Sequence, residues 1–282
     1  MLCFFCSDIH GSKSRYEKLL DAVRRERPRA LFLGGDLLPH AMVSDPAFPD
    51  FVGDFMAERF SRLRDELGEE YPDIFLILGN DDPRCEEEAV MEAAERGIWH
   101  YLHDRRAGLS EFTIYGYSHV PPSPFLLKDW ERYDVSRYVD PGSVSPEEGR
   151  RSVPVDSRDV RYGTILRDLD ELAGDANLEN AIFLFHSPPY DTLLDRAALD
   201  GRMVDHVPLD VHVGSIAIRR FIEERQPLVT MHGHVHESAR MSGSWRQKLG
   251  RTHMFGGAHD GPELAVVRFD PHEPGEASRE IL

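Results

Sequence analysis

The stretch Leu2-Cys3-Phe4-Phe5-Cys6-Ser7-Asp8-Ile9-His10-Gly11 begins with a short apolar run and then turns polar. Such a run, bounded by a polar turn, predicts a buried β-strand. In open α/β sheets, ligands bind outside the carboxyl ends of the strands. Asp8 and His10 follow this strand and offer a carboxylate oxygen and an imidazole nitrogen, a pair that suits Mn, Fe or Zn.

The same arrangement, an apolar run followed by side chains that can bind a metal, recurs along the chain. The runs 29–33, 74–78, 180–185 and 228–231 precede, respectively, Asp36, Asn80, His186, and the pair His234 and His236. Apolar residues at helical spacing over 12–25, with Pro28 just beyond, join the first two strands. Strand, helix and strand in this order predict a parallel unit with a right-handed crossover, and hence an α/β protein.

Together the strand ends supply more candidate metal ligands than a single structural site needs. The candidates are Asp8, His10, Asp36, Asn80, His186, His234 and His236. This set exceeds the ligands of one tetrahedral zinc, and it fits two metal ions that share a bridging carboxylate. A closed thiolate site is excluded because the chain has only three cysteines.

Composition restricts the partners and the compartment. A formal charge of −17 over 282 residues argues against long nucleic acid or an anionic membrane as a partner. It allows a small phosphorylated substrate, whose charge metal ions can neutralise. Few and unpaired cysteines favour a reducing compartment, and no secretion signal precedes the first strand, so we expect a cytoplasmic protein. Cys3 and Cys6 match Cys-x-x-Cys, but in a strand they face opposite sides, which favours small strand residues over a redox or zinc pair.

The remaining pattern predicts one domain over residues 1–282. Helices are expected over 51–67, 86–96, 162–172 and 216–224, strands of a second sheet over 97–102 and 112–117, closing strands over 252–255 and 264–269, and a turn-rich loop over 45–49. Residues 120–161 are irregular but rich in aromatic side chains, unlike a disordered linker. Two interpretations remain open: an ordered insertion that lies over the site or forms a partner surface, or a solvent-exposed loop without a function.

The ordered set of motifs resembles the calcineurin-like metallophosphoesterase family. The matching motifs are Asp8-x-His10, Gly35-Asp36, Gly79-Asn80-x-Asp82, His186 and Gly233-His234-x-His236. The resemblance implies a four-layer α/β/β/α sandwich of two mixed sheets flanked by helices. It implies that Asp8, His10 and His236 hold one metal, that Asn80, His186 and His234 hold the other, and that Asp36 bridges them. A hydroxide between the two cations would then attack phosphorus while the cations neutralise the phosphoryl oxygens.

The chain departs from the family at Asp81, where the family usually has the histidine of Gly-Asn-His-Asp or Gly-Asn-His-Glu. That histidine protonates the leaving group or stabilises the phosphate, whereas an ionised carboxylate repels phosphate and needs a raised pKa to act as an acid. The chain thus resembles a bacterial and archaeal branch without this histidine. Asp81 and Asp82 are the candidate catalytic residues. Other candidate acids, each also explained as a surface or core histidine, are His40, His119, His206, His212 and His232.

These observations predict a dinuclear metal-dependent phosphoesterase that acts on a small phosphodiester or phosphomonoester. Diesters, and leaving groups that need little protonation, are favoured because the motif histidine is missing. Mn²⁺ is the favoured metal, with Fe, Zn or Ni as alternatives. The competing interpretations are a nuclease and a non-catalytic metal-binding scaffold of the same fold. A homo-oligomer is compatible with the sequence.

Overall fold

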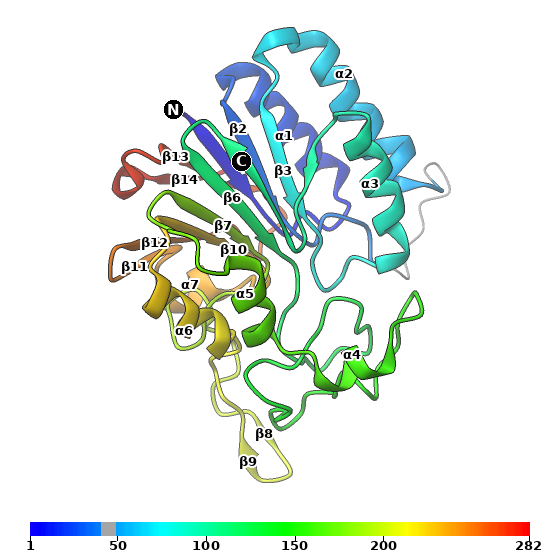
Figure 1. Cartoon of the computed structure of the whole chain (residues 1–282), viewed down its shortest axis with the longest axis vertical. Helices are drawn as coiled ribbons and strands as arrows, with labels where there is room; N and C mark the ends of the chain where they lie inside the picture. The colour runs from blue at the N-terminus through cyan, green and yellow to red at the C-terminus, as the bar shows by residue number, and fades with distance from the viewer. Residues whose placement is uncertain (41–48) are drawn as a thin grey trace.

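The computed structural model describes residues 1–40 and 49–282, and in this part of the chain two six-stranded mixed sheets pack against each other (Figure 1). The first sheet has the order β14 (Ser278–Ile281), β13 (Ala265–Phe269), β1 (Cys3–Cys6), β2 (Ala30–Gly34), β3 (Asp73–Ile77), β4 (His100–Tyr101). The second has the order β11 (Arg246–Leu249), β12 (Thr252–Gly256), β10 (Val229–His232), β7 (Ala181–Phe185), β6 (Phe112–Tyr117), β5 (Arg105–Leu109). A small hairpin, β8 (Met203–Val204) and β9 (Val207–Pro208), stands apart.

The central strands of the first sheet have two buried faces because the sheet is covered on both sides. Phe4 and Cys6 of β1 belong to the core under the first group of helices. Cys3 and Phe5 belong to the core between the two sheets. The two cysteines therefore face opposite sides of the strand, as its twofold periodicity requires. Strands β1, β2 and β3 run parallel, so their carboxyl ends meet at one edge.

Helices cover the outer face of each sheet. The α-helices of the described residues are α1 (Lys13–Glu26), α2 (Glu58–Leu67), α3 (Glu87–Glu95), α4 (Ser157–Tyr162), α5 (Ile165–Ala173), α6 (Ile216–Arg225) and α7 (Ser238–Ser242); α4 lies away from both sheets. In Figure 1, α1 to α3 lie beside the first sheet, and α5 and α6 lie beside the second. The predicted four-layer α/β/β/α sandwich is confirmed. Within the described ranges no helix has both the length and the apolar character needed to cross a membrane.

Three predicted elements differ from the structure. Strand β4, within the predicted strand 97–102, pairs in parallel with β3 and so extends the first sheet rather than the second. The helix predicted over 162–172 is α5 but begins three residues later, because Gly163 is extended and the Thr164 side chain accepts the Arg167 amide at 3.2 Å; Tyr162 instead ends α4. The helix predicted over 51–67 begins as a π-helical segment, Phe51–Ala57. The loop predicted over 45–49 lies, apart from Pro49, outside the described residues.

Residues 120–161 pack against the loop that follows β3. The Trp130 side chain is fully buried, and its Nε1 donates to the carbonyl of Asp82 at 2.8 Å. Asp129 accepts the amide of Arg84 at 2.8 Å. Further along, Asp134 accepts the Ile216 amide at 2.7 Å at the start of α6. This segment therefore joins the third motif loop to the second group of helices, below the ends of both sheets in Figure 1.

His119, which immediately precedes this segment, is expected to make folding stability depend on pH. Its side chain is buried among His103, Tyr117 and Trp130, and burial holds its pKa well below the usual value. The unfolded imidazole binds a proton near pH 6.5 while the folded one stays neutral, so stability falls as the pH drops below about 6.5. His119→Phe keeps a ring in place and should remove this slope, worth at most about 1.4 kcal/mol per pH unit.

Urea unfolding of both proteins at three values between about pH 7 and pH 5, which bracket the ordinary pKa of histidine, measures this slope. The comparison of slopes separates titration from the change in packing that the substitution also makes. If the free energy of unfolding depends on pH equally in wild type and His119→Phe, His119 does not contribute to the acid sensitivity of the fold.

Candidate metal centre

Backbone hydrogen bonds join the polar segments that follow β1 and β2. The Asp8 amide donates to the Gly35 carbonyl at 3.0 Å, and the His10 amide donates to the Asp36 carbonyl at 2.8 Å. Arg15 of α1 adds a bond from Nη1 to the Asp8 carbonyl at 2.7 Å. The Asp-x-His and Gly-Asp segments are thus held as one unit. Arg15 was not a candidate from the sequence because its helical position gave no signal of this contact.

Several candidate ligands have an uncommon backbone conformation. Asp8, His10, Asp36 and His234 have φ values of 57°, 50°, 51° and 72°, in the left-handed region that non-glycine residues rarely adopt. Such residues are often found where the surrounding structure fixes a functional side chain. Here the conformation turns side chains at the strand ends toward a common point.

Four of the candidate ligands form a compact cluster. Asp8, His10, Asp36 and His236 each place one ligand atom so that all four atoms lie within 4.8 Å of one another. The Nε2 atoms of His10 and His236 are 3.0 Å apart. The Nε2 of His236 lies 3.2 Å from Asp8 Oδ1. Imidazole nitrogens and carboxylate oxygens at these separations can surround one divalent cation.

A second group converges on the other side of Asp36. His186 Nε2 lies 3.0 Å from Asn80 Oδ1 and 3.2 Å from Asp36 Oδ2. His186 Nδ1 faces the Gly34 carbonyl at 2.8 Å, so in a neutral ring the hydrogen belongs on Nδ1. The Nε2 lone pair then points at two oxygens, and that arrangement requires a cation, either a proton or a metal.

His234 belongs beside this second group. Its ring centroid lies 5.3 Å from that of His186, and its amide donates to Asp8 Oδ1 at 3.0 Å. Burial, with the nearby charge of His186, lowers the pKa of His234 to about 4. The imidazole is therefore neutral at physiological pH, which is the form that binds metals.

The oxygen atoms of Asp8 test whether this arrangement fits a metal. Asp8 is almost fully buried, and its Oδ2 has no hydrogen-bond partner among the described residues. A buried carboxylate oxygen without a partner is costly unless a cation satisfies it. Together with the paired imidazole nitrogens, this oxygen shows that the residues present fit a divalent metal.

The charges of the centre depend on one another. Burial alone would raise the pKa values of Asp8 and Asp36, but the neighbouring imidazoles hold both below the usual range. Burial alone would lower the pKa of His186, but Asp36 raises it to about 10. Likewise Asp8, against the effect of burial, raises the pKa of His236 to about 9. In the metal-free protein, protonated imidazoles therefore supply the positive charge that the carboxylates require.

The two predicted catalytic carboxylates have different surroundings. The Asp81 amide donates to Asp36 Oδ1 at 2.8 Å, while burial and the charge of Asp36 raise the pKa of the Asp81 carboxyl. Asp82 is fully buried and accepts backbone amides at both oxygens, from Leu37 at 3.1 Å, Leu38 at 2.8 Å and Gly79 at 2.8 Å. Burial and the charge of Asp36 raise its pKa to about 8. Asp82 thus fastens the second motif loop to the third.

Gly79→Ala is expected to weaken metal binding without unfolding the protein. A Cβ at this position would lie 2.3 Å from Asp36 Oδ1, 2.5 Å from the Asp36 backbone nitrogen and 2.7 Å from His186 Cε1, so both side chains and the Asp36 backbone must move. Loss of ligand positioning typically costs about 10- to 100-fold in metal affinity, which titration calorimetry measures directly. Gly108→Ala is the matched control, because a Cβ there meets nothing within 4 Å. An unchanged affinity in Gly79→Ala would show that this close packing does not hold the ligands.

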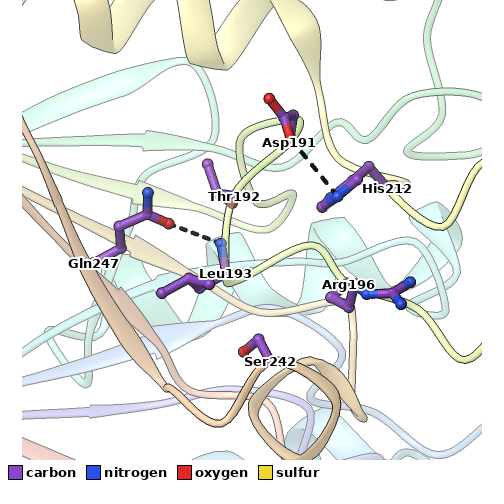
Figure 2. A pocket seen from close by; sticks show the side chains of 7 residues that line it. All are labelled: Asp191, Thr192, Leu193, Arg196, His212, Ser242 and Gln247. Atoms are coloured by element: carbon purple, nitrogen blue, oxygen red, sulfur yellow. Dashed lines mark hydrogen bonds and ion pairs between the residues drawn. The ribbon is translucent and has the colours of Figure 1, made fainter.

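A cavity lies outside the cluster, beyond the loop that carries His186. It has a volume of about 330 Å³ and is lined by Asp191, Thr192, Leu193, Arg196, His212, Ser242 and Gln247. Figure 2 shows His212 facing Asp191, and the Leu193 amide bonded to Gln247 at 2.7 Å. None of the candidate metal ligands lines this cavity.

Comparison with known proteins agrees with the fold and the motif set. The calcineurin-like phosphoesterase family profile matches residues 1–238. The chain therefore belongs to the calcineurin-like phosphoesterases. Members of this family are metal-dependent hydrolases, and the cluster around Asp36 is the candidate metal-binding site in this chain.

Similar individual proteins are distant or match only a short segment. The uncharacterized protein MJ1162 of Methanocaldococcus jannaschii is 39% identical over 64 residues, which are 22% of this chain and 26% of that protein. The crystal structure of TT1561 of Thermus thermophilus covers 99% of this chain and 98% of its own, with a TM-score of 0.56 and 14% identity. Another crystal structure has a TM-score of 0.60 with 16% identity over the same shares. These structures share the fold of this chain.

Proposed function

We propose that this chain is a dinuclear metal-dependent phosphoesterase that hydrolyses a small phosphodiester or phosphomonoester, with diesters preferred. The observation that carries the proposal is the position of Asp36. Its Oδ2 lies 3.2 Å from His186 Nε2 on one side and 4.0 Å from His10 Nε2 on the other. Asp8, His10 and His236 would hold one cation, and Asn80, His186 and His234 the other. Mn²⁺ is the metal we favour.

The role of the chain is to hold the metal-binding side chains in position. Two bound cations would activate water as the nucleophile and neutralise the phosphoryl oxygens. The backbone bonds of Asp8 and His10 to the second motif fix the cluster before substrate arrives. Asp82 joins the second and third motifs through its bonds to Leu38 and Gly79. Such fixed positioning supplies much of the catalytic effect in phosphoryl transfer.

Hydrolysis of a chromogenic aryl phosphodiester and its monoester by metal-stripped protein, with and without Mn²⁺, tests the proposal. We expect turnover only with added metal, and faster turnover of the diester. A protein that retains two metals but hydrolyses neither ester would overturn the proposal and favour a scaffold. Degradation of a labelled oligonucleotide in preference to small esters would instead indicate a nuclease.

A further inference from the structure

The centre lacks an obvious donor for the leaving group, because Asp81 stands where a histidine is usual in the family. The sequence singled out five other histidines as candidate proton donors, and their surroundings in the structure differ. Two lie in the interior: His232 has its ring nitrogens 2.9 Å from the Ser187 carbonyl and 2.8 Å from Thr230 Oγ1, and His119 is packed beside Trp130. Neither faces the cluster around Asp36.

Two more histidines lie away from the metal ligands. The Nδ1 of His212 is 2.8 Å from the buried carboxylate of Asp195, and the ring borders the separate cavity of Figure 2. His206 is exposed in the turn between β8 and β9. The remaining candidate is His40, whose Nε2 lies 3.3 Å from Asp81 Oδ2.

Asp81 connects His40 to the centre. Its amide is bonded to Asp36 Oδ1 at 2.8 Å, so the position of its backbone is set by the proposed bridging carboxylate. Its Oδ2 lies 3.6 Å from His10 Nδ1 as well as 3.3 Å from His40 Nε2. A carboxylate between two imidazoles orients both rings, as carboxylates do beside metal-binding histidines.

His40 has the exposure that a group acting on substrate needs. It follows Asp36 by four residues in the second motif loop, and 63% of its side chain is exposed. The Asp81 side chain is only 17% exposed. The imidazole is therefore the part of this pair that an incoming ester can reach, while the carboxylate lies behind it.

We propose that His40, oriented by Asp81, replaces the missing motif histidine as the proton donor to the leaving group. This inference rests on the proposed function. Water adds its oxygen to phosphorus and releases one proton to solvent, the bond from phosphorus to the leaving oxygen breaks, and that oxygen keeps the electron pair and takes the proton of the His40 imidazolium. The imidazole regains a proton from solvent. This donor extends the substrates from activated aryl esters to phosphodiesters with alcohol leaving groups, such as sugar or glycerol hydroxyls.

The dependence of rate on the leaving group tests His40. An alkoxide leaving group needs a proton donor, whereas p-nitrophenolate does not. In His40→Asn we therefore expect kcat for an alkyl phosphodiester to fall by about 10²- to 10⁴-fold, while kcat for bis(p-nitrophenyl) phosphate changes little. Mn²⁺ content should stay that of wild type. His206→Asn, an exposed histidine far along the chain, is the matched control and should leave both rates unchanged.

The outcomes separate this inference from the proposed function. If wild type hydrolyses neither ester with Mn²⁺ bound, the proposed function fails and His40 has no reaction to assist. If wild type is active and His40→Asn lowers both rates equally, or neither, His40 is not the proton donor. Partial recovery of alkyl ester hydrolysis in His40→Gly by added imidazole would support the role independently.

Discussion

Replacing Asp36 with alanine is expected to lower metal-dependent phosphoesterase activity by on the order of 10³-fold or more, beyond the loss seen for a single oxyanion donor. The physical reason is that one carboxylate oxygen of Asp36 approaches imidazole nitrogens of both groups of candidate ligands, with Oδ2 at 3.2 Å from His186 Nε2 and 4.0 Å from His10 Nε2. Its Oδ1 also accepts the Asp81 amide. One substitution therefore removes the proposed shared ligand and the acceptor that holds the Asp81 amide in the third motif loop.

Activity and bound metal should be measured on the same preparations. Elemental analysis after dialysis should show that Asp36→Ala holds less metal than wild type, and circular dichroism should show a retained fold. Asp65→Ala is the matched control, since Asp65 is an exposed carboxylate on α2. Full activity in Asp36→Ala would contradict the bridged arrangement.

Lys128→Met is expected to give the largest change in stability, a loss of about 3–5 kcal/mol in the free energy of unfolding. Lys128 and Glu131 form an ion pair in which both side chains are fully buried. Lys128 Nζ also donates to the Ser123 carbonyl at 2.8 Å. Methionine fills a similar volume, but it leaves the Glu131 carboxylate buried without its cation, and a buried unpaired charge is strongly unfavourable.

Denaturant unfolding of Lys128→Met and of the double variant Lys128→Met/Glu131→Leu tests this explanation. The double variant should recover most of the lost stability, because no charge remains buried. Burial already raises the pKa of Glu131, and loss of the cation raises it further. The folded variant then binds a proton that the unfolded chain releases, so its deficit should shrink as the pH falls. Equal losses in both variants would assign the effect to packing alone.

The sequence was sufficient to predict the layers of the fold and to predict that the candidate metal ligands lie close together. Apolar runs such as Phe4-Phe5 are long enough to be buried on both faces, and parallel strands place their carboxyl ends at one edge. Asp8 and Asp36 therefore had to be neighbours once the strand order was known. The break at Gly163 and Thr164 was missed because the apolar spacing continues across it.

Contacts that depend on irregular segments could not be predicted. His40 and Asp81 are far apart in sequence, and their contact depends on how two loops approach each other. The same holds for the hydrogen bond from Trp130 to the Asp82 carbonyl, because no sequence pattern relates these two residues. Periodicity describes strands and helices; it carries no information on where a loop side chain lies.

Asp8, His10, Asp36 and His234 have a left-handed backbone conformation. At these positions, thermal stability and metal binding favour different residues. Each such residue costs about 1–3 kcal/mol relative to a relaxed conformation, and glycine would relieve that cost while removing a ligand. Selection of variants for thermostability alone would therefore tend to erode the metal centre, whereas selection for activity preserves a chain that is less stable than it could be. Engineering of this protein should accordingly leave these four positions fixed and seek stability on its helical surfaces.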